Sequence, residues 1–146
     1  MSREPDLRTQ VRPEWIDYNG HLSEAYYVLV FGFATDALMG RIGMDAAYLE
    51  NTGCSLYIVE AHVRYLREVP ADSELLITTR VIDTGAKKLR MCHEMVVGET
   101  LVATTELMAL HVDGEQGRAT PFPQEIADEL ASRVEPAPEY AGRSIG

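Results

Sequence analysis

The chain has 146 residues, a length typical of one domain. Its 13 Lys and Arg stand against 23 Asp and Glu, a formal net charge of −10 without any basic run, so we expect no nucleic-acid partner. Hydrophobic residues make up 46 % of the chain, which argues against disorder. We expect a cytoplasmic protein without signal peptide or membrane partner, because 1–10 is charged and no apolar run reaches about 18 residues.

The first half of the chain is predicted to be mainly helical. A short strand over 7–12 leads into a loop over 13–21 that contains Pro, Asn and Gly. The pattern over 22–40 predicts a helix with apolar side chains on every side and no charge between Glu24 and Asp36. Such a helix is expected to be buried on most sides. A shorter helix is predicted over 45–51.

The second half predicts a sheet. Four long strands are expected, over 55–67, 74–83, 89–97 and 101–112, and the short turns between them favour antiparallel pairing. An amphipathic helix is predicted over about 124–134, before a loose tail over 135–146. The sequence thus predicts a single α+β domain over 1–146, with a core over 7–112. Its curved antiparallel sheet of about five strands would wrap around the long buried helix.

The segment Asp17-Tyr18-Asn19-Gly20-His21, with Tyr27 in the following helix, resembles hot-dog fold acyl-CoA thioesterases of the 4-hydroxybenzoyl-CoA thioesterase type. Those enzymes carry an Asp, and a Gly three positions later, just before the central helix; the resemblance covers about 7–112. The stretches 15–21, 34–38 and 108–113 are similar to the betainyl-CoA thioesterase group, whose domain occurs alone or fused to carnitine dehydrogenase. The resemblance implies hydrolysis of a small acyl-CoA, such as betainyl-CoA in carnitine breakdown, without a cofactor besides the substrate's coenzyme A.

The resemblance also implies a catalytic loop. Asp17 would act as nucleophile or as the base for water, and the alternative is a carboxylate that caps a helix or turn. Gly20 would let the backbone approach the thioester, and N–H groups over 20–23 would stabilise the oxyanion. His21 would orient the substrate or Asp17, or pack on the helix start. Asn19 would hold a water or cap the helix.

Aromatic side chains could hold a quaternary ammonium acyl group by their ring faces. The candidates for substrate binding are Trp15, Tyr18, Tyr26, Tyr27 and Tyr57. Core packing is the alternative for each. Trp15 and Tyr18 are favoured because a loop offers them no obvious core.

Basic residues that follow the turn at 84–87 are the candidates for CoA binding, since the resemblance places phosphate contacts there. They are Lys87, Lys88 and Arg90, and a solvated turn is the alternative. In a hot-dog dimer the strand 55–67 lies at the subunit interface, so Glu60, His62 and Arg64 would form an ion pair across it. We therefore expect a homodimer or a dimer of dimers, which also covers the sheet edge.

Metal binding and disulfide formation are not expected. The four histidines lack the spacing of metal ligands, and Cys54 and Cys92 are predicted to be reduced thiols. Two other function classes stay open. An R-specific enoyl-CoA hydratase of the same fold would need Asp-x-Asn-Pro-x-His, but here the Pro is missing and His21 comes one residue early. A non-catalytic acyl-CoA binding module would not need Asp17.

Overall fold

The structure, a computed structural model, describes residues 3–146, which divide into two compact units. Among the described residues, the first unit comprises 3–38, Val63–Thr79 and His93–Thr105, and the second comprises Met39–His62, Arg80–Cys92 and Glu106–Gly146. The expectation of a single domain over 1–146 stays a prediction.

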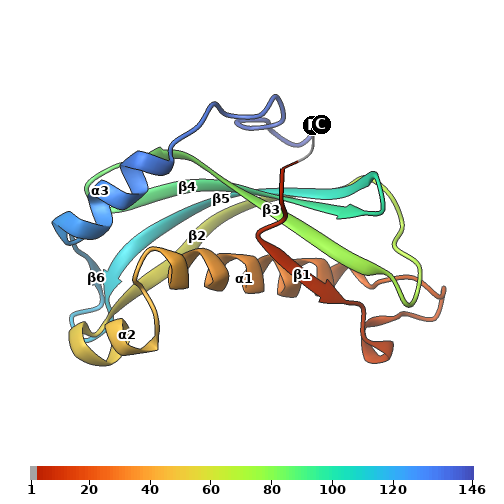
Figure 1. Cartoon of the computed structure of the whole chain (residues 1–146), viewed down its shortest axis with the longest axis horizontal. Coiled ribbons are helices and arrows are strands. Elements are labelled where there is room, and N and C mark those ends of the chain that lie inside the picture. Colours follow the sequence, from red (N-terminus) through yellow and green to blue (C-terminus); the bar gives the residue numbers. More distant parts are fainter. Residues whose placement is uncertain (1–2) are drawn as a thin grey trace. The chain divides into compact units, whose positions relative to one another are not determined.

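The elements follow the predicted order, with a 3₁₀ helix and a short sixth strand added (Figure 1). The helices are α1 (Glu24–Arg41), α2 (Ala46–Thr52) and α3 (Gln124–Arg133), and the 3₁₀ helix spans Pro13–Trp15. The strands are β1 (Leu7–Gln10), β2 (Cys54–Tyr65), β3 (Glu74–Thr84), β4 (Lys88–Val97), β5 (Thr100–Asp113) and β6 (Arg118–Ala119). They pair in the order β1-β3-β4-β5-β2, and β6 pairs with β5.

The first unit contains most of α1 and an apolar core. Strand β1 runs antiparallel to β3 (Figure 1), and the register places Leu7 opposite Ile77. The buried side chains of α1 recur every three or four residues, so they share one face; they are Tyr27, Val30, Phe31, Ala34, Thr35 and Leu38. Each large apolar side chain buried here contributes about 1.5–3 kcal/mol. The other face exposes Val28 (50 %) and Leu29 (40 %), so the expectation of a helix buried on most sides is wrong for this chain alone.

A buried histidine joins three elements of the first unit. His93 on β4 is 0 % exposed, and its ring stacks on Phe31 at 6.0 Å. Its Nε2 lies 2.9 Å from the hydroxyl of Thr35, and its Nδ1 lies 2.8 Å from the hydroxyl of Thr79. Burial lowers the pKa of His93 from 6.5 to about 4, because the charged form loses hydration. The ring is therefore neutral at pH 7.

In the second unit, α2 is closed at both ends by specific residues. The Asp45 side chain accepts a hydrogen bond from the Tyr48 N–H, and Gly53 ends the helix with φ +72°, a conformation that favours glycine. His111 on β5 holds α2 through its Nε2, which lies 2.7 Å from the Tyr48 hydroxyl. Its Nδ1 lies 2.9 Å from the carbonyl oxygen of Thr120, so Nδ1 carries the proton and Nε2 accepts from Tyr48.

Strand β2 is the last strand in the pairing order, and its middle is open. Tyr57, Ile58 and Val59 are exposed by 48 %, 45 % and 55 %. Over 57–61 the side chains of both faces of the strand are exposed. An uncovered edge of this length is a surface at which another strand can pair.

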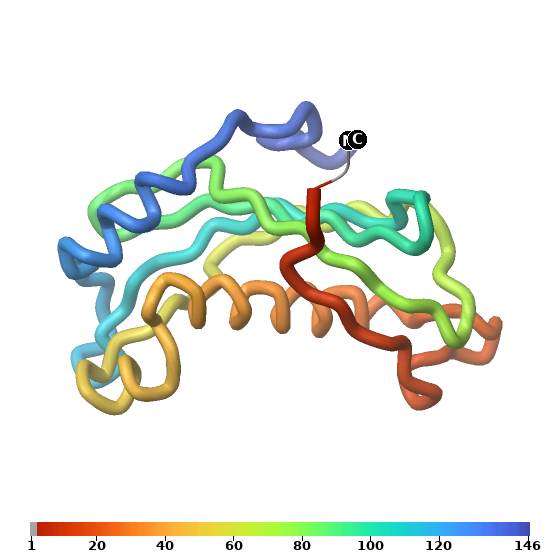
Figure 2. The backbone as a smooth tube through the Cα atoms, in the orientation of Figure 1, coloured from red at the N-terminus to blue at the C-terminus, as the bar shows by residue number. Residues whose placement is uncertain are grey.

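The C-terminal segment is held by hydrogen bonds to other parts of the second unit. Helix α3 buries Ile126 and Leu130, as its spacing predicts, whereas Val134 is exposed. Beyond α3, which is blue in Figure 2, Glu135 accepts a hydrogen bond from Arg80 at 2.8 Å. The Gly142 N–H donates to Glu106 at 2.6 Å. The tail over 135–146 is therefore less loose than expected.

Over 3–146, no single helix has the length and hydropathy to cross a bilayer. Helices α1 and α2 taken together have that length and hydropathy, but they are bent by 70° at the break between them.

Candidate functional site

The loop before α1 is folded back on itself in the first unit. Ile16 and Leu22 form an antiparallel β-bridge. His21 forms a second one with Pro70, which lies in the connection between β2 and β3. Gly20 has φ +81°, which an L side chain would strain, so this position favours glycine. No atom lies within 4 Å of where its Cβ would stand, so glycine is needed here for the turn. The loop thereby presents Asp17 next to the start of α1.

The Asp17 carboxylate is fixed through one oxygen. Its Oδ1 accepts the N–H of Asn19 at 2.9 Å and the N–H of His21 at 3.4 Å. This is the turn-capping role that was the alternative to catalysis. It leaves Oδ2 without a protein partner among residues 3–146, so one carboxylate oxygen holds the turn while the other can react.

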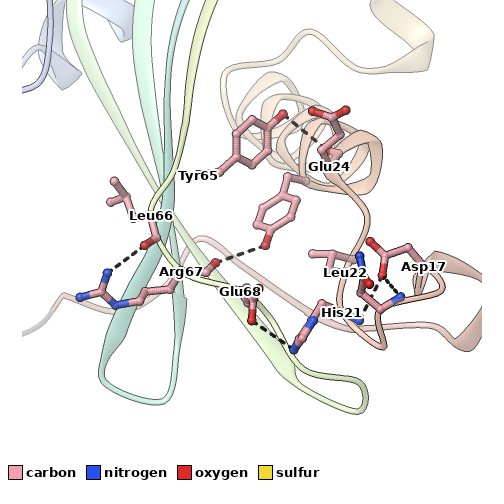
Figure 3. A pocket seen from close by; sticks show the side chains of 10 residues that line it. Asp17, His21, Leu22, Glu24, Tyr65, Leu66, Arg67 and Glu68 are labelled. Atoms are coloured by element: carbon pink, nitrogen blue, oxygen red, sulfur yellow. Dashed lines mark hydrogen bonds and ion pairs between the residues drawn. The ribbon is translucent and has the colours of Figure 1, made fainter. Parts of the chain in front are cut away.

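Asp17 lines a cavity of about 380 Å³ in the first unit (Figure 3). The polar, charged and aromatic residues that share this cavity are Asn19, His21, Glu24, Tyr27, Tyr65, Arg67 and Glu68. The lining therefore has three carboxylates against one guanidinium, and the Arg67 guanidinium donates to the Leu66 carbonyl (Figure 3). With two tyrosines beside this excess of negative charge, the lining is more attractive to a cation with apolar groups than to an anion.

The side chain of His21 turns toward Glu68. In Figure 3 the ring points at this carboxylate, and Nε2 lies 3.3 Å from its Oε2. The two groups are 36 % and 77 % exposed, so the pair contributes little to stability. The contact sets the direction of the imidazole, and it joins the loop before α1 to the segment after β2.

Tyr27 and Tyr65 form the aromatic wall. Their ring centroids are 5.0 Å apart at an interplanar angle of 89°. The Tyr27 hydroxyl donates to the carbonyl of Arg67 at 3.3 Å, and the Tyr65 hydroxyl donates to the carbonyl of Glu24 at 3.5 Å. Burial raises the pKa of both phenols, and the neighbouring Tyr65 and Glu68 raise that of Tyr27 further, as Glu24 does that of Tyr65. Both phenols therefore stay protonated at neutral pH.

The sequence patterns do not identify Tyr65 or Glu68 as site residues. No short spacing connects 65–68 with the loop at 17–24, because the sheet brings them together. The one available signal is an aromatic residue at the end of a strand, followed closely by a carboxylate.

The expected oxyanion donors are already used. Gly20 N–H donates to the Asp17 carbonyl, Leu22 N–H to Val69, and Ser23 N–H to Trp15, at 2.9–3.0 Å. His21 N–H donates to the Asp17 side chain. The expectation that N–H groups over 20–23 bind the oxyanion is therefore wrong in this conformation. The first-turn N–H groups of α1, which have no acceptor inside a helix, are the remaining donors.

Asn19 lines the cavity but does not occupy the capping position of α1. The helix begins at Glu24, so that position belongs to Ser23. The expectation that Asn19 caps the helix is corrected: its backbone N–H serves the turn at Asp17 instead.

The other aromatic candidates lie in different surroundings. Trp15 is 4 % exposed, stacks on Tyr26 at 5.8 Å, and has the Arg12 guanidinium 5.4 Å from its ring centre. The expectation that a loop tryptophan finds no core is thus wrong, because the 3₁₀ helix turns Trp15 inward. Tyr18 is 97 % exposed, and Tyr57 lies on β2 in the second unit.

The basic candidates gather around a second cavity, of about 370 Å³, in the second unit. Lys88, Arg90, Glu60 and His62 line it. Lys87 is exposed, and its carbonyl accepts the His111 N–H; Arg64 belongs to the first unit.

Arg90 and Glu106 form an ion pair in this cavity. The hydrogen bond from Arg90 and its charge keep the pKa of Glu106 low; burial alone would raise it, and the Gly142 N–H also lowers it. The same hydrogen bond raises the pKa of Arg90.

Cys54 and Cys92 are both buried, and no disulfide joins them to another cysteine among residues 3–146. Among residues 3–146, no group of three or more His, Cys, Asp or Glu side chains is placed to hold a metal ion.

Comparison with known proteins identifies the family. Residues 11–130 match the family described as the Thioesterase-like superfamily. The chain is 40 % identical to betainyl-CoA thioesterase of Pseudomonas aeruginosa, over 94 % of this chain and 91 % of that protein. It is 44 % identical to the L-carnitine dehydrogenase/betainyl-CoA thioesterase of Agrobacterium fabrum, over 90 % of this chain but 28 % of that protein.

The fold is also that of solved relatives. A protein of Staphylococcus aureus, solved in complex with CoA, superposes with a TM-score of 0.89 over 100 % of this chain and 98 % of that chain, at 22 % identity. The predicted α+β hot-dog fold is thereby confirmed. With a family match over 11–130 and these relatives, the chain belongs to the Thioesterase-like superfamily and is a thioester hydrolase.

Proposed function

We propose that the protein hydrolyses an acyl-CoA thioester, and that betainyl-CoA is its substrate. The observation that carries the proposal is the Asp17 carboxylate, which is fixed by the loop through Oδ1 and lines a cavity at the start of α1. A carboxylate anchored on one side is preorganised for proton transfer or attack on the other.

Two routes use the free oxygen of Asp17. In the first, Oδ2 takes a proton from water, the hydroxide adds to the thioester carbon, the C–S bond breaks, and the CoA thiolate leaves and is protonated. In the second, Oδ2 attacks the same carbon, CoA leaves, and water cleaves the resulting mixed anhydride. Single-turnover hydrolysis in ¹⁸O water separates them, because the first route always gives an acid with one labelled oxygen. In the second route, attack of water on the Asp17 carboxyl carbon of the anhydride gives an acid with two unlabelled oxygens and leaves the label on Asp17.

The positive end of α1 supplies the oxyanion stabilisation. We assign it to the first-turn N–H groups at Glu24 and Ala25, since the N–H groups over 20–23 donate elsewhere. Aligned peptide dipoles make this end of a helix favourable for a developing negative charge. His21, held by Glu68, positions the substrate; it does not contact the Asp17 carboxylate through its ring.

The cavity chemistry supports a cationic acyl group. A betainyl group ends in trimethylammonium, which cannot accept or donate a strong hydrogen bond and is attracted to aromatic faces and carboxylates. Tyr65, which is 46 % exposed, offers such a face, and Glu24 and Glu68 offer the charges. The names of the relatives from Pseudomonas aeruginosa and Agrobacterium fabrum point to the same substrate.

The assembly that we propose is a homodimer, which can pair further into a tetramer. Strand β2 ends the sheet and exposes apolar side chains over 57–59, so a second copy can pair along this edge. Glu60, His62 and Arg64 would then flank the pairing strands.

A thiol-release assay tests the proposed function. The panel contains betainyl-CoA, 4-hydroxybenzoyl-CoA and short straight-chain acyl-CoA thioesters, and hydration of crotonyl-CoA is measured in parallel. We expect CoA release, fastest with betainyl-CoA. Hydration without thiol release would support a hydratase, and binding without either reaction would support a binding module.

A further inference from the structure

The chain contains two asparagines, Asn19 and Asn51, and both are exposed. They differ in the residue that follows. Asn19 precedes Gly20 in the loop before α1, whereas Asn51 precedes the β-branched Thr52 at the end of α2. A backbone nitrogen can attack the side-chain carbonyl carbon of the asparagine before it, most readily in glycine, which has no side chain in the way. Asn19 is therefore the asparagine of this chain at which such a reaction is expected.

The surroundings of Asn19 leave its side chain free to react. Its backbone N–H donates to Asp17, but its side-chain amide forms no hydrogen bond with any residue over 3–146. No atom lies within 4 Å of the place where a Cβ of Gly20 would stand, so that side of the glycine is open. The neighbouring Tyr18 is 97 % exposed, so its ring does not cover the turn.

Hydrogen bonds to Asp17 restrain Asn19 and Gly20. The Gly20 N–H donates to the Asp17 carbonyl at 3.0 Å, and Oδ1 of Asp17 accepts the N–H groups of Asn19 and His21 (Figure 3). While these bonds last, the Gly20 nitrogen is directed at the Asp17 carbonyl and not at the Asn19 side chain. Exposed backbone hydrogen bonds open locally at a small cost in free energy. The reaction therefore proceeds from the opened turn, at a rate that the Asp17 hydrogen bonds limit.

We propose that Asn19 is a site of spontaneous deamidation, and that its products disturb the Asp17 carboxylate. The Gly20 nitrogen loses its proton to a base in the solvent and bonds to Cγ of Asn19. The bond from Cγ to Nδ2 breaks, and Nδ2 takes up a proton and leaves as ammonia. Water then opens the cyclic imide. Attack of water at Cγ gives aspartate, and attack at the main-chain carbonyl carbon gives isoaspartate, in which the backbone continues through Cβ and Cγ.

Both products change the surroundings of Asp17. Each adds a negative charge to the cavity that Asn19 and Asp17 line, and this charge opposes the oxyanion that forms during hydrolysis. Isoaspartate also lengthens the main chain by one methylene, so the N–H groups at 19 and 21 lose the spacing at which Oδ1 accepts both. The effect on activity rests on the proposed function, whereas the deamidation itself does not.

Peptide mapping by mass spectrometry, on protein aged in weakly alkaline buffer, tests the site. Asn51 is the matched control, because it has the same side chain and is also exposed. We expect modification at Asn19 to be at least about tenfold faster, since only Asn19 precedes glycine. Asp17→Ala removes the acceptor of two N–H groups and should speed the reaction at Asn19 severalfold without changing Asn51. Faster reaction at both asparagines would instead indicate general unfolding and contradict the restraint by Asp17.

Thiol release is measured in the same samples, relative to each protein before ageing. We expect the activity of the wild type to fall in step with the modified fraction at Asn19. Asn19→Gln should keep its starting activity, because the longer side chain closes a ring much more slowly. Equal rates at Asn19 and Asn51, including none at either, would overturn the site, and modification without loss of activity would overturn its effect on Asp17. A wild type without thioesterase activity would refute the proposed function, and the mass measurement would still decide the site.

Discussion

The rings of Tyr27 and Tyr65 meet edge to face in the Asp17 cavity, with centroids 5.0 Å apart and planes at 89°. Tyr27 is 4 % exposed and belongs to the core, whereas Tyr65 keeps 46 % of its surface open. The two tyrosines therefore have different roles. Tyr27 packs in the core and supports the ring of Tyr65, and Tyr65 exposes its ring to the cavity.

Substrate selectivity should depend on the ring of Tyr65 more than on its hydroxyl. The comparison uses betainyl-CoA and 3,3-dimethylbutanoyl-CoA, which has the same shape with carbon in place of the charged nitrogen. Tyr65→Phe loses a long hydrogen bond of 3.5 Å but keeps the face, so the ratio of kcat/KM for the two substrates should stay within about twofold.

Tyr65→Leu removes the face and should lower that ratio about fivefold, since a cation–π contact contributes about 0.5–2 kcal/mol. The kcat/KM ratio is the measurement, because a general loss of activity would move both substrates together. A wild type without preference for the cation would contradict betainyl-CoA as the substrate while leaving thioester hydrolysis intact.

Acid should destabilise the protein through His93. Its pKa falls from 6.5 in the unfolded chain to about 4 when folded, so protonation favours unfolding. The contribution is full above about pH 6.5 and is lost as the pH falls toward 4, by about 3 kcal/mol in total. Urea unfolding at a series of pH values measures it.

His93→Gln is the comparison variant for the pH series, because its side-chain amide can still form a hydrogen bond with the hydroxyl of Thr35 or Thr79. We expect the variant to be less stable at pH 7 and to lose less stability between pH 6.5 and 4. Parallel curves for variant and wild type would show that His93 is not the acid-sensitive group.

The hydroxyl of Tyr48 should stabilise the second unit. Tyr48→Phe leaves the buried Nε2 of His111 without its donor at 2.7 Å, while the ring still packs. The free energy of unfolding should fall by about 1–3 kcal/mol. Urea unfolding at pH 7 checks this, and a change below about 0.3 kcal/mol would mean that water replaces the hydroxyl.

The β2 edge should carry the dimer. Val59→Lys places a charge in the exposed apolar stretch and should shift the protein toward monomer in light scattering at micromolar concentration. Leu49→Lys, an equally exposed apolar position on α2, should leave the dimer intact. A monomeric wild type would contradict the proposed assembly, and a dimeric Val59→Lys would place the interface elsewhere.

Local patterns explain which parts of this molecule are readable from sequence. The charge-free run after Glu24 marks α1, and alternation marks the long strands, because both depend on neighbours in the chain. Asp17 is found through a short motif next to that helix. Tyr65 and Arg143 cannot be found in this way. The cavity that Tyr65 lines is formed by sheet pairing, and the cavity that Arg143 lines is formed where the C-terminal tail returns to the sheet.

Burial is the part that sequence predicts least well here. Trp15 looks like a free loop residue, yet the 3₁₀ helix turns it into the core. Val28 and Val59 look like core residues, yet α1 packs through one face and β2 lies at an edge. Composition cannot distinguish an apolar side chain that its own chain buries from one that only a second chain would cover.

The central claim is that Asp17 performs the hydrolysis, and Asp17→Asn tests it most directly. Asparagine keeps an oxygen for the N–H groups of Asn19 and His21, so the loop should survive, while the reactive carboxylate is lost. With betainyl-CoA in the thiol-release assay, we predict a fall in kcat of about 10²–10⁴-fold with an unchanged circular dichroism spectrum. Equal thiol release by Asp17→Asn and wild type would contradict the account.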